Sequence, residues 1–203
     1  MSQWLNVNRG DRLDYLVSMS SRAAGMKHYA KRIGGKDHPS TKLDYRMGDV
    51  NTTLIRTHSG ISITLYYDTQ NPRPVDFIWR VQGTSGIYSG TLDKIHLEDR
   101  SPAHQWEATD KYLEEYDHPN WRKYGEIARQ SGPGGSDYLC FLDFVTAVRN
   151  KTEAPIDVYD AVTWSIITEL SEQSADNKSR PVDFPDFTRG KWKTRAPFRV
   201  EAI

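Results

Sequence analysis

Hydrophobic and polar residues alternate through the middle of the chain, and this period of two predicts β-strands. The alternation is clearest over Ile61–Tyr67 and continues a pattern begun in Thr52–Thr57. Between them, the His-Ser-Gly sequence at 58–60 predicts a hairpin turn. Further strands are predicted at 77–82, 87–89 and 94–98. Because short turns join successive strands, we expect one open, mainly antiparallel sheet of about five or six strands.

The last third of the chain shows the spacing of three and four that is typical of helices. One apolar stripe follows Ser136, and a second follows Asp157, which forms a predicted capping box with Asp160. Weaker patterns predict helices over Ser21–Ile33 and Pro119–Gln130. The two stripes comprise Tyr138, Phe141, Leu142, Val145 and Val148, and then Val158, Val162, Ile166 and Leu170. The predicted class is therefore α+β, with the two late helices packed on one face of the sheet.

The two ends of the chain carry weaker patterns. Residues 1–19 are predicted to be irregular or extended, and the proline-rich stretch after Ser179 predicts an extended tail. With 203 residues, 37% of them hydrophobic, the chain can bury a substantial core. We expect a single domain over 1–203, with 180–203 as its C-terminal tail.

Charge and cysteine content narrow the classes of partner. The 27 basic and 27 acidic residues cancel, so there is no electrostatic reason to expect nucleic acid or an anionic membrane as a partner. Cys140 is the single cysteine, which excludes an intrachain disulfide. The N-terminus carries no apolar signal core. The default compartment is the cytoplasm, and the periplasm or secretion stays open if the sequence is a piece of a longer protein.

The nearest approach to a nucleotide-binding motif is the glycine-rich stretch 132–137. Dinucleotide binding needs a strand, then G-x-G-x-x-G, then a helix whose N-terminus receives the pyrophosphate. Here Asp137 replaces the last glycine, Pro133 interrupts the motif, and no apolar strand precedes it. We therefore expect a glycine loop that leads into a capped helix, and no cofactor site in this chain.

The sequence also has no local motif for a hydrolase active site or for a metal site. The six histidines form no pair at i, i+4, and no G-x-S-x-G elbow is present, so we assign no metal ligand and no triad. Asp183 and Asp186 lie close together, which most often marks a solvated face. An alternative is a sugar site lined by carboxylates and exposed aromatics such as Trp192.

Seven segments in order carry a resemblance to a known family, and it covers nearly the whole chain. Together they resemble the C-terminal domain of glycoside hydrolase family 109, a glycosidase branch of the Gfo/Idh/MocA oxidoreductases. The segments are Trp4–Arg12, Gly48–Thr53, Pro72–Pro74, Val81–Gly86, Gly134–Asp137, Asp157–Ala161 and Val182–Gly190.

The resemblance implies redox-assisted glycoside cleavage. Family members, typified by α-N-acetylgalactosaminidases, hold NAD on an N-terminal Rossmann domain and oxidise the sugar at C3. The C2 proton becomes acidic, elimination expels the aglycone, water adds back, and the retained NADH reduces C3. This route needs no paired carboxylates. Homo-oligomers are the habit of the family.

The departures from the family pattern concern the site itself. The family's histidine- and tyrosine-bearing segment precedes the point that matches Ser2, and its Rossmann domain precedes that segment, so we expect this sequence to hold neither. Val75 stands where the family usually has a sugar-contacting tyrosine, and Pro133 stands where it usually has a histidine. We assign no catalytic residue. Arg73, Asp137 and Val75 are candidate substrate-binding residues, with loop and helix-cap roles as the alternatives for Arg73 and Asp137.

Three functions are consistent with these residues. The first is one half of a family 109-like glycosidase, inactive without a nucleotide-binding partner, with NAD implied for the full-length family and a sugar or glycoside as substrate. The second is the C-terminal half of a sugar dehydrogenase of the same superfamily. The third is a non-catalytic domain that binds a protein or itself through the free sheet face, where Tyr66 and Arg80 are expected.

Overall fold

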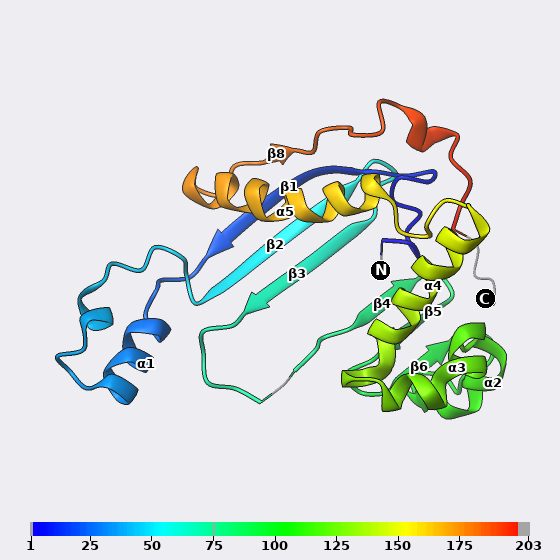
Figure 1. Cartoon of the computed structure of the whole chain (residues 1–203), viewed down its shortest axis with the longest axis horizontal. Helices are drawn as coiled ribbons and strands as arrows, with labels where there is room; N and C mark the ends of the chain where they lie inside the picture. Colours follow the sequence, from blue (N-terminus) through cyan, green and yellow to red (C-terminus); the bar gives the residue numbers. More distant parts are fainter. Residues whose placement is uncertain (1, 75, 199–203) are drawn as a thin grey trace. The chain divides into compact units, whose positions relative to one another are not determined.

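The computed structural model describes residues 2–74 and 76–198, which divide into two compact units (Figure 1). The first unit contains residues 2–71 and 147–198, and the second contains 72–146 without 75. Each unit has its own sheet, and each is described separately below.

The first unit is built on a four-stranded antiparallel sheet with the order β3-β2-β1-β8. The strands are β1 (Leu13–Ser20), β2 (Val50–Thr57), β3 (Ser62–Asp68) and β8 (Val182–Asp183). The hairpin predicted at 58–60 is confirmed, since it joins β2 to β3. Residues 13–20, which the sequence pattern leaves as irregular or extended chain, form an internal strand.

Helix α5 (Val158–Asp176) runs along β1 and β8 in the same unit (Figure 1). The capping box of Asp157 and Asp160 is confirmed. The predicted apolar stripe is wrong at Val158, which is 71% exposed, but it is confirmed at Leu170, which is buried, and at Ile166, which packs against the core. The residues that the helix buries are largely polar: Asp160, Thr163, Leu170, Ser171 and Ser174.

Hydrogen bonds to the sheet explain this polar face. The Ser174 hydroxyl accepts from the backbone N–H of Ser18 at 2.8 Å, and the hydroxyls of Ser171 and Thr53 lie 3.2 Å apart. A buried hydroxyl without a partner would be costly, so these contacts determine which side of α5 faces the strands. Between the polar contacts lies a small apolar core of Val7, Leu13, Leu16, Ile55, Leu170 and Phe184.

One end of the first unit carries a helical segment beyond the strands (Figure 1). It contains α1 (Gly25–Gly34) and the short 3-10 helix η1 (Pro39–Lys42). The helix begins later than the predicted Ser21 because the Asp49 carboxylate accepts from the backbone N–H groups of Ala24 and Gly25, at 2.8 to 3.1 Å. Asp49 therefore supplies the N-terminal cap from a distant part of the chain.

The second unit has its own four-stranded antiparallel sheet, with the order β4-β5-β6-β7. The strands are β4 (Arg80–Gly83), β5 (Gly86–Ser89), β6 (Lys94–Leu97) and β7 (Glu107–Ala108). The α+β class and the antiparallel pairing are confirmed, whereas the expected single sheet is replaced by two. Pro72 and Pro74 lie between β3 and β4 and lack backbone donors, so this stretch is poorly suited to extend a ladder.

The helices of the second unit are α2 (Asp110–Tyr116), α3 (Pro119–Gln130) and α4 (Ser136–Asn150), whose last residues belong to the first unit. The bounds of α3 are as predicted, and α2 was not predicted. The stripe predicted to be the core side of α4 is wrong at two positions, because Phe141 is 69% and Val148 60% exposed. The buried side of α4 contains Leu139 and Ala147 instead. Among the described helices, α5 packs on β1 and β8 of the first sheet, in place of the expected pair of helices on one sheet.

None of the helices in the described part of the chain has the length and apolar character needed to cross a bilayer.

Candidate functional site

Arg73 lies in the loop that opens the second unit, and its side chain is exposed. Its Nη1 donates to the backbone carbonyl of Asp76 at 3.4 Å. A guanidinium carries five N–H donors. Val75 lies outside the described residues.

Asp137 lies in the first turn of α4, where its exposed carboxylate is favourably placed against the partial positive charge of the helix N-terminus. The loop before it is fixed by close packing. Gly135 has a φ of +75°, and a Cβ there would lie 2.8 Å from the carbonyl carbon of Ala128 in α3. Only glycine fits at that point, so the approach of the loop to α3 determines where α4 starts.

The geometry of the same loop does not fit the pyrophosphate of NAD. A dinucleotide site requires a strand before the glycine loop, so that the pyrophosphate meets a helix N-terminus at the sheet edge. Here the loop follows helix α3 and begins with the 3-10 helix η2 (Pro133–Gly135). No reaction step is therefore assigned to NAD within this chain.

A buried ionic network in the first unit was not predicted as a group. Nη1 of Arg9 donates to Asp160 at 2.8 Å, and Nη2 donates to Asp157 at 3.4 Å. Arg195 also pairs with Asp157, and its guanidinium lies 5.0 Å from the ring centroid of Tyr159. The bond to Asp160 raises the pKa of Arg9 above its ordinary value, against the effect of burial. The network joins the N-terminal loop, the start of α5 and the C-terminal tail.

The amide of Asn8 extends this network. Its Nδ2 lies 3.3 Å from Asp160 Oδ1 and 3.2 Å from the Thr163 hydroxyl. Asn8 and Arg9 belong to the segment Trp4–Arg12, and Asp160 belongs to Asp157–Ala161, so both partners lie in segments that carry the resemblance. The presence of these partners in two segments of the resemblance was the sequence signal for the network. In the structure, these residues connect the N-terminal loop to α5.

A polar hollow of about 580 Å³ brings together the carboxylates considered in the sequence analysis. Asp186 is occupied there by a turn, since it accepts from the backbone N–H groups of Thr188 and Gly190 at 2.9 and 2.8 Å. Burial opposes ionisation, but the Thr188 hydroxyl and these backbone donors outweigh it and lower the pKa of Asp186. Trp192 is buried and meets the ring of His58 edge-on. The hollow is lined by Arg12, Asp14, His58, Asp183, Phe184, Asp186, Gly190, Trp192 and Lys193.

The hollow therefore offers polar contacts without the pair of free carboxylates that direct hydrolysis uses. Arg12 is also paired there, with Asp14 at 2.8 Å. Across residues 2–74 and 76–198, no cluster of three His, Cys, Asp or Glu side chains is arranged to hold a metal ion.

Asp143 on α4 is a further residue that the sequence patterns missed. Burial raises the pKa of its carboxyl, while the charge of His118 acts in the opposite direction. Nδ2 of Asn120 donates to it at 3.4 Å. Asp143 and Asp137 lie on the same helix, six residues apart, so α4 carries one half-buried and one exposed carboxylate.

Comparison with known protein families gives a match over almost the whole chain. The model described as "Glycosyl hydrolase 109, C-terminal domain" matches residues 1–194. This chain belongs to that family. The seven segments that carry the resemblance all lie within the matched residues.

Two relatives of the family 109 chain share 44% and 39% of the aligned residues with it. A glycosyl hydrolase family 109 protein of Stenotrophomonas maltophilia is 44% identical over 197 residues, which cover 97% of this chain and 43% of that protein. An alpha-N-acetylgalactosaminidase of Tannerella forsythia is 39% identical over 193 residues, which cover 95% of this chain and 41% of that protein. The chain thus spans less than half the length of these relatives.

A solved structure shares the fold of the family 109 chain. The crystal structure of an oxidoreductase domain protein from Kribbella flavida matches with a TM-score of 0.52 and 13% identity, over 87% of this chain and 46% of that one. At that identity the likeness concerns the fold alone. It agrees with the expected α+β fold.

Proposed function

We propose that this family 109 chain is the substrate-side part of an NAD-dependent glycosidase that acts on α-N-acetylgalactosaminides, and that it is inactive alone. The observation that carries the proposal is the family match over residues 1–194, together with the relative that is named an alpha-N-acetylgalactosaminidase. In this proposal, the chain shapes the sugar site and supplies an oligomer interface.

The candidate sugar contacts differ in what they can offer. The exposed Arg73 guanidinium can donate to sugar hydroxyls, and the exposed Asp137 carboxylate can accept from them. Val75 can offer only an apolar contact, because its side chain has no donor or acceptor. Any base or acid that moves a proton in the reaction would then come from residues outside this chain.

The cofactor of the family would also bind outside this chain, because the described glycine loop does not have the geometry of a dinucleotide site. Calorimetric titration of the 203-residue polypeptide with NAD should therefore show no binding heat at millimolar NAD. A micromolar dissociation constant would mean that these residues contain a nucleotide site.

A second candidate is a sugar dehydrogenase of the same superfamily. Val75 and Pro133 favour it, because they replace the tyrosine and the histidine that the family usually has at these points. A dehydrogenase would oxidise its sugar and release NADH, whereas the glycosidase would keep the cofactor and release an aglycone.

A self-association surface is proposed for the open face of the first sheet. Strand register places Met19, Thr52 and Tyr66 side by side, with Leu54 on the same face. Met19, Leu54 and Tyr66 are exposed, while the opposite face packs the core. A sheet face with exposed apolar and aromatic side chains favours association with a second copy. Arg80, expected on this face, belongs to β4 in the other sheet.

A fusion protein tests the proposed function. The part of the Stenotrophomonas relative that this chain does not cover is fused to residues 1–203, and the fusion is incubated with p-nitrophenyl α-N-acetylgalactosaminide. We expect p-nitrophenol release by the fusion, none by the 203 residues alone, and no build-up of NADH. NADH accumulation on free sugars without aglycone release would favour the dehydrogenase.

A further inference from the structure

Although the net charge of the chain is zero, residues 22–46 form a strongly basic segment. The segment holds seven basic residues and two acidic ones, a net charge of +5, so the remaining residues together carry −5. These charges lie on α1, on η1 and in the loops around them. The basic residues are Arg22, Lys27, Lys31, Arg32, Lys36, Lys42 and Arg46, and the acidic residues are Asp37 and Asp44.

Some of these basic residues line a hollow of about 510 Å³. The hollow lies between α1 and the residues that precede and form η1. Lys27 and Lys31 are four residues apart on α1, so they lie on the same side of the helix. Lys36 lines the hollow from the following loop, and His28 and Thr41 complete its polar lining. The volume lies within the range of small-molecule sites.

The hollow is held in shape by fixed contacts. Asp49 caps the start of α1, and the Thr41 hydroxyl lies 3.0 and 2.7 Å from the carbonyl oxygens of Lys36 and His38, to which its one proton can be donated. At Gly34, a Cβ would lie 2.5 Å from the His38 ring, so the turn between α1 and η1 is closely packed. The lysines therefore project from a defined backbone.

The described residues supply no carboxylate counter-charge to these lysines. Within the described residues, Lys27, Lys31 and Lys36 have no carboxylate within 4.0 Å. Like charges at i, i+4 repel each other on a helix, and a third ammonium beside them adds to the repulsion. A bound anion would remove this repulsion and use the three ammonium groups together.

We propose that this hollow binds a tetrahedral oxyanion ester, sulfate or phosphate, carried on a sugar-sized molecule. Three ammonium donors match the several oxygens of such a group, and lysine binds it as a point charge. The concave shape favours a compact group over a flat membrane surface. This inference does not depend on the proposed glycosidase function.

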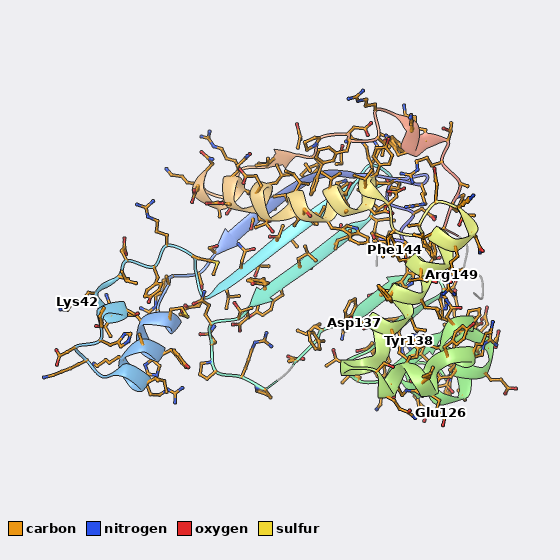
Figure 2. The ribbon with its side chains drawn as sticks, in the orientation of Figure 1. Lys42, Glu126, Asp137, Tyr138, Phe144 and Arg149 are labelled. Carbon is orange, nitrogen blue, oxygen red and sulfur yellow. The ribbon has the colours of Figure 1, made fainter. Side chains whose placement is uncertain are left out.

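The test is calorimetric titration of the full chain with galactose 6-sulfate, galactose 6-phosphate and uncharged galactose. The double variant Lys27→Gln, Lys31→Gln is compared with Lys42→Gln. Lys42, labelled in Figure 2, lies in the same basic segment but is not among the residues that line the hollow. Thermal melting of each variant confirms folding. We expect saturable binding of at least one ester in preference to galactose, weakened roughly tenfold or more in the double variant, since contacts to charged groups are the stronger class. Lys42→Gln should bind like the parent chain.

The two esters distinguish a sulfated from a phosphorylated ligand. Absence of saturable ester binding would overturn the proposal, as would equal weakening by Lys42→Gln, which would indicate diffuse charge attraction. Vesicles that contain phosphatidylserine form a further arm. Binding to vesicles without binding to either ester would assign the basic segment to a membrane surface and overturn the proposal.

Discussion

The pairing of Arg9 with Asp160 connects chain segments that are 151 residues apart, at a point where both side chains are almost inaccessible to solvent. Their side chains are 9% and 2% exposed. A buried pair adds little stability over well-packed apolar residues, but removal of one partner leaves an uncompensated charge. Arg9 also contacts Asp157, so the network determines how the N-terminal loop sits on α5.

Asp160→Ala should therefore be strongly destabilising, by about 3 kcal/mol or more in the free energy of unfolding. Urea unfolding, followed by tryptophan fluorescence, measures the change. The matched control is Asp176→Ala on the exposed end of the same helix, which should change stability by at most about 0.5 kcal/mol. Equal effects of the two substitutions would show that the network does not hold α5.

Asp11 gives the first unit a pH dependence. Burial opposes ionisation, but donors from Ser59 and from the backbone of Arg12 outweigh it and hold the pKa of Asp11 below its ordinary value of 3.8. A carboxyl with a lowered pKa in the folded state stabilises above the unfolded-state pKa, and the stabilisation is lost as pH falls through the folded-state pKa.

The variant Asp11→Asn should accordingly be less stable than the parent chain by an amount that is constant above about pH 5. The difference should shrink as the pH falls below 3.8, the ordinary value for this carboxyl. Ser59→Ala should reproduce part of the difference, because Ser59 donates to Asp11 through both its backbone and its hydroxyl. A difference that grows toward low pH would contradict the assignment.

Among the elements, the loop that joins α3 to α4 has the most demanding backbone. Gly135 combines a positive φ with close approach to the α3 backbone. Gly135→Ala should destabilise the second unit by more than about 1 kcal/mol, since it adds both a clash and a strained conformation. Gly83→Ala is the matched control, because a Cβ there would meet no atom within 4 Å. Differential hydrogen exchange of α3 and α4 measures the effect, and identical protection in both variants would rule out this account.

Sequence patterns were sufficient for elements whose signals are local. The bounds of α3 and the cap at Asp157 follow from residues within one turn of each other. The buried face of α5 could not be predicted in this way, because its hydroxyls bond to Ser18 and Thr53 in strands far away in the sequence. The division into two sheets likewise depends on which strands pair, and alternation alone carries no pairing information.

For the candidate site too, local features could be predicted from the sequence and long-range ones could not. Position and spacing placed Arg73 in a loop and Asp137 in a first helical turn, and the structure has them there. Their proposed contacts with a sugar depend on surfaces that no local pattern encodes. The half-buried carboxyl of Asp143 was missed because its partial burial arises from helices that pack together.

For the whole molecule, the open face of the first sheet predicts self-association. Sedimentation velocity should show species larger than the 23.3 kDa of one chain, with a concentration-dependent distribution. Leu54→Glu would place a charge at the centre of this face and should shift the distribution to the monomer. Leu92→Glu, at an exposed position in the second unit, should leave it unchanged. A parent chain that is monomeric at all concentrations would exclude the interface.

The central claim is that residues 1–203 form the substrate side of a family 109 enzyme, and an exchange of halves tests it most directly. The N-terminal part of the Stenotrophomonas relative is kept constant and joined either to its own C-terminal part or to this chain. The kcat/KM of each is then measured on a panel of aryl glycosides. If this chain shapes the sugar site, the order of preference changes with the C-terminal part, and Val75→Tyr raises the rate on the α-N-acetylgalactosaminide by roughly 10² to 10³, the value of one positioned donor. Identical profiles for both fusions, unmoved by Val75→Tyr, would contradict the claim.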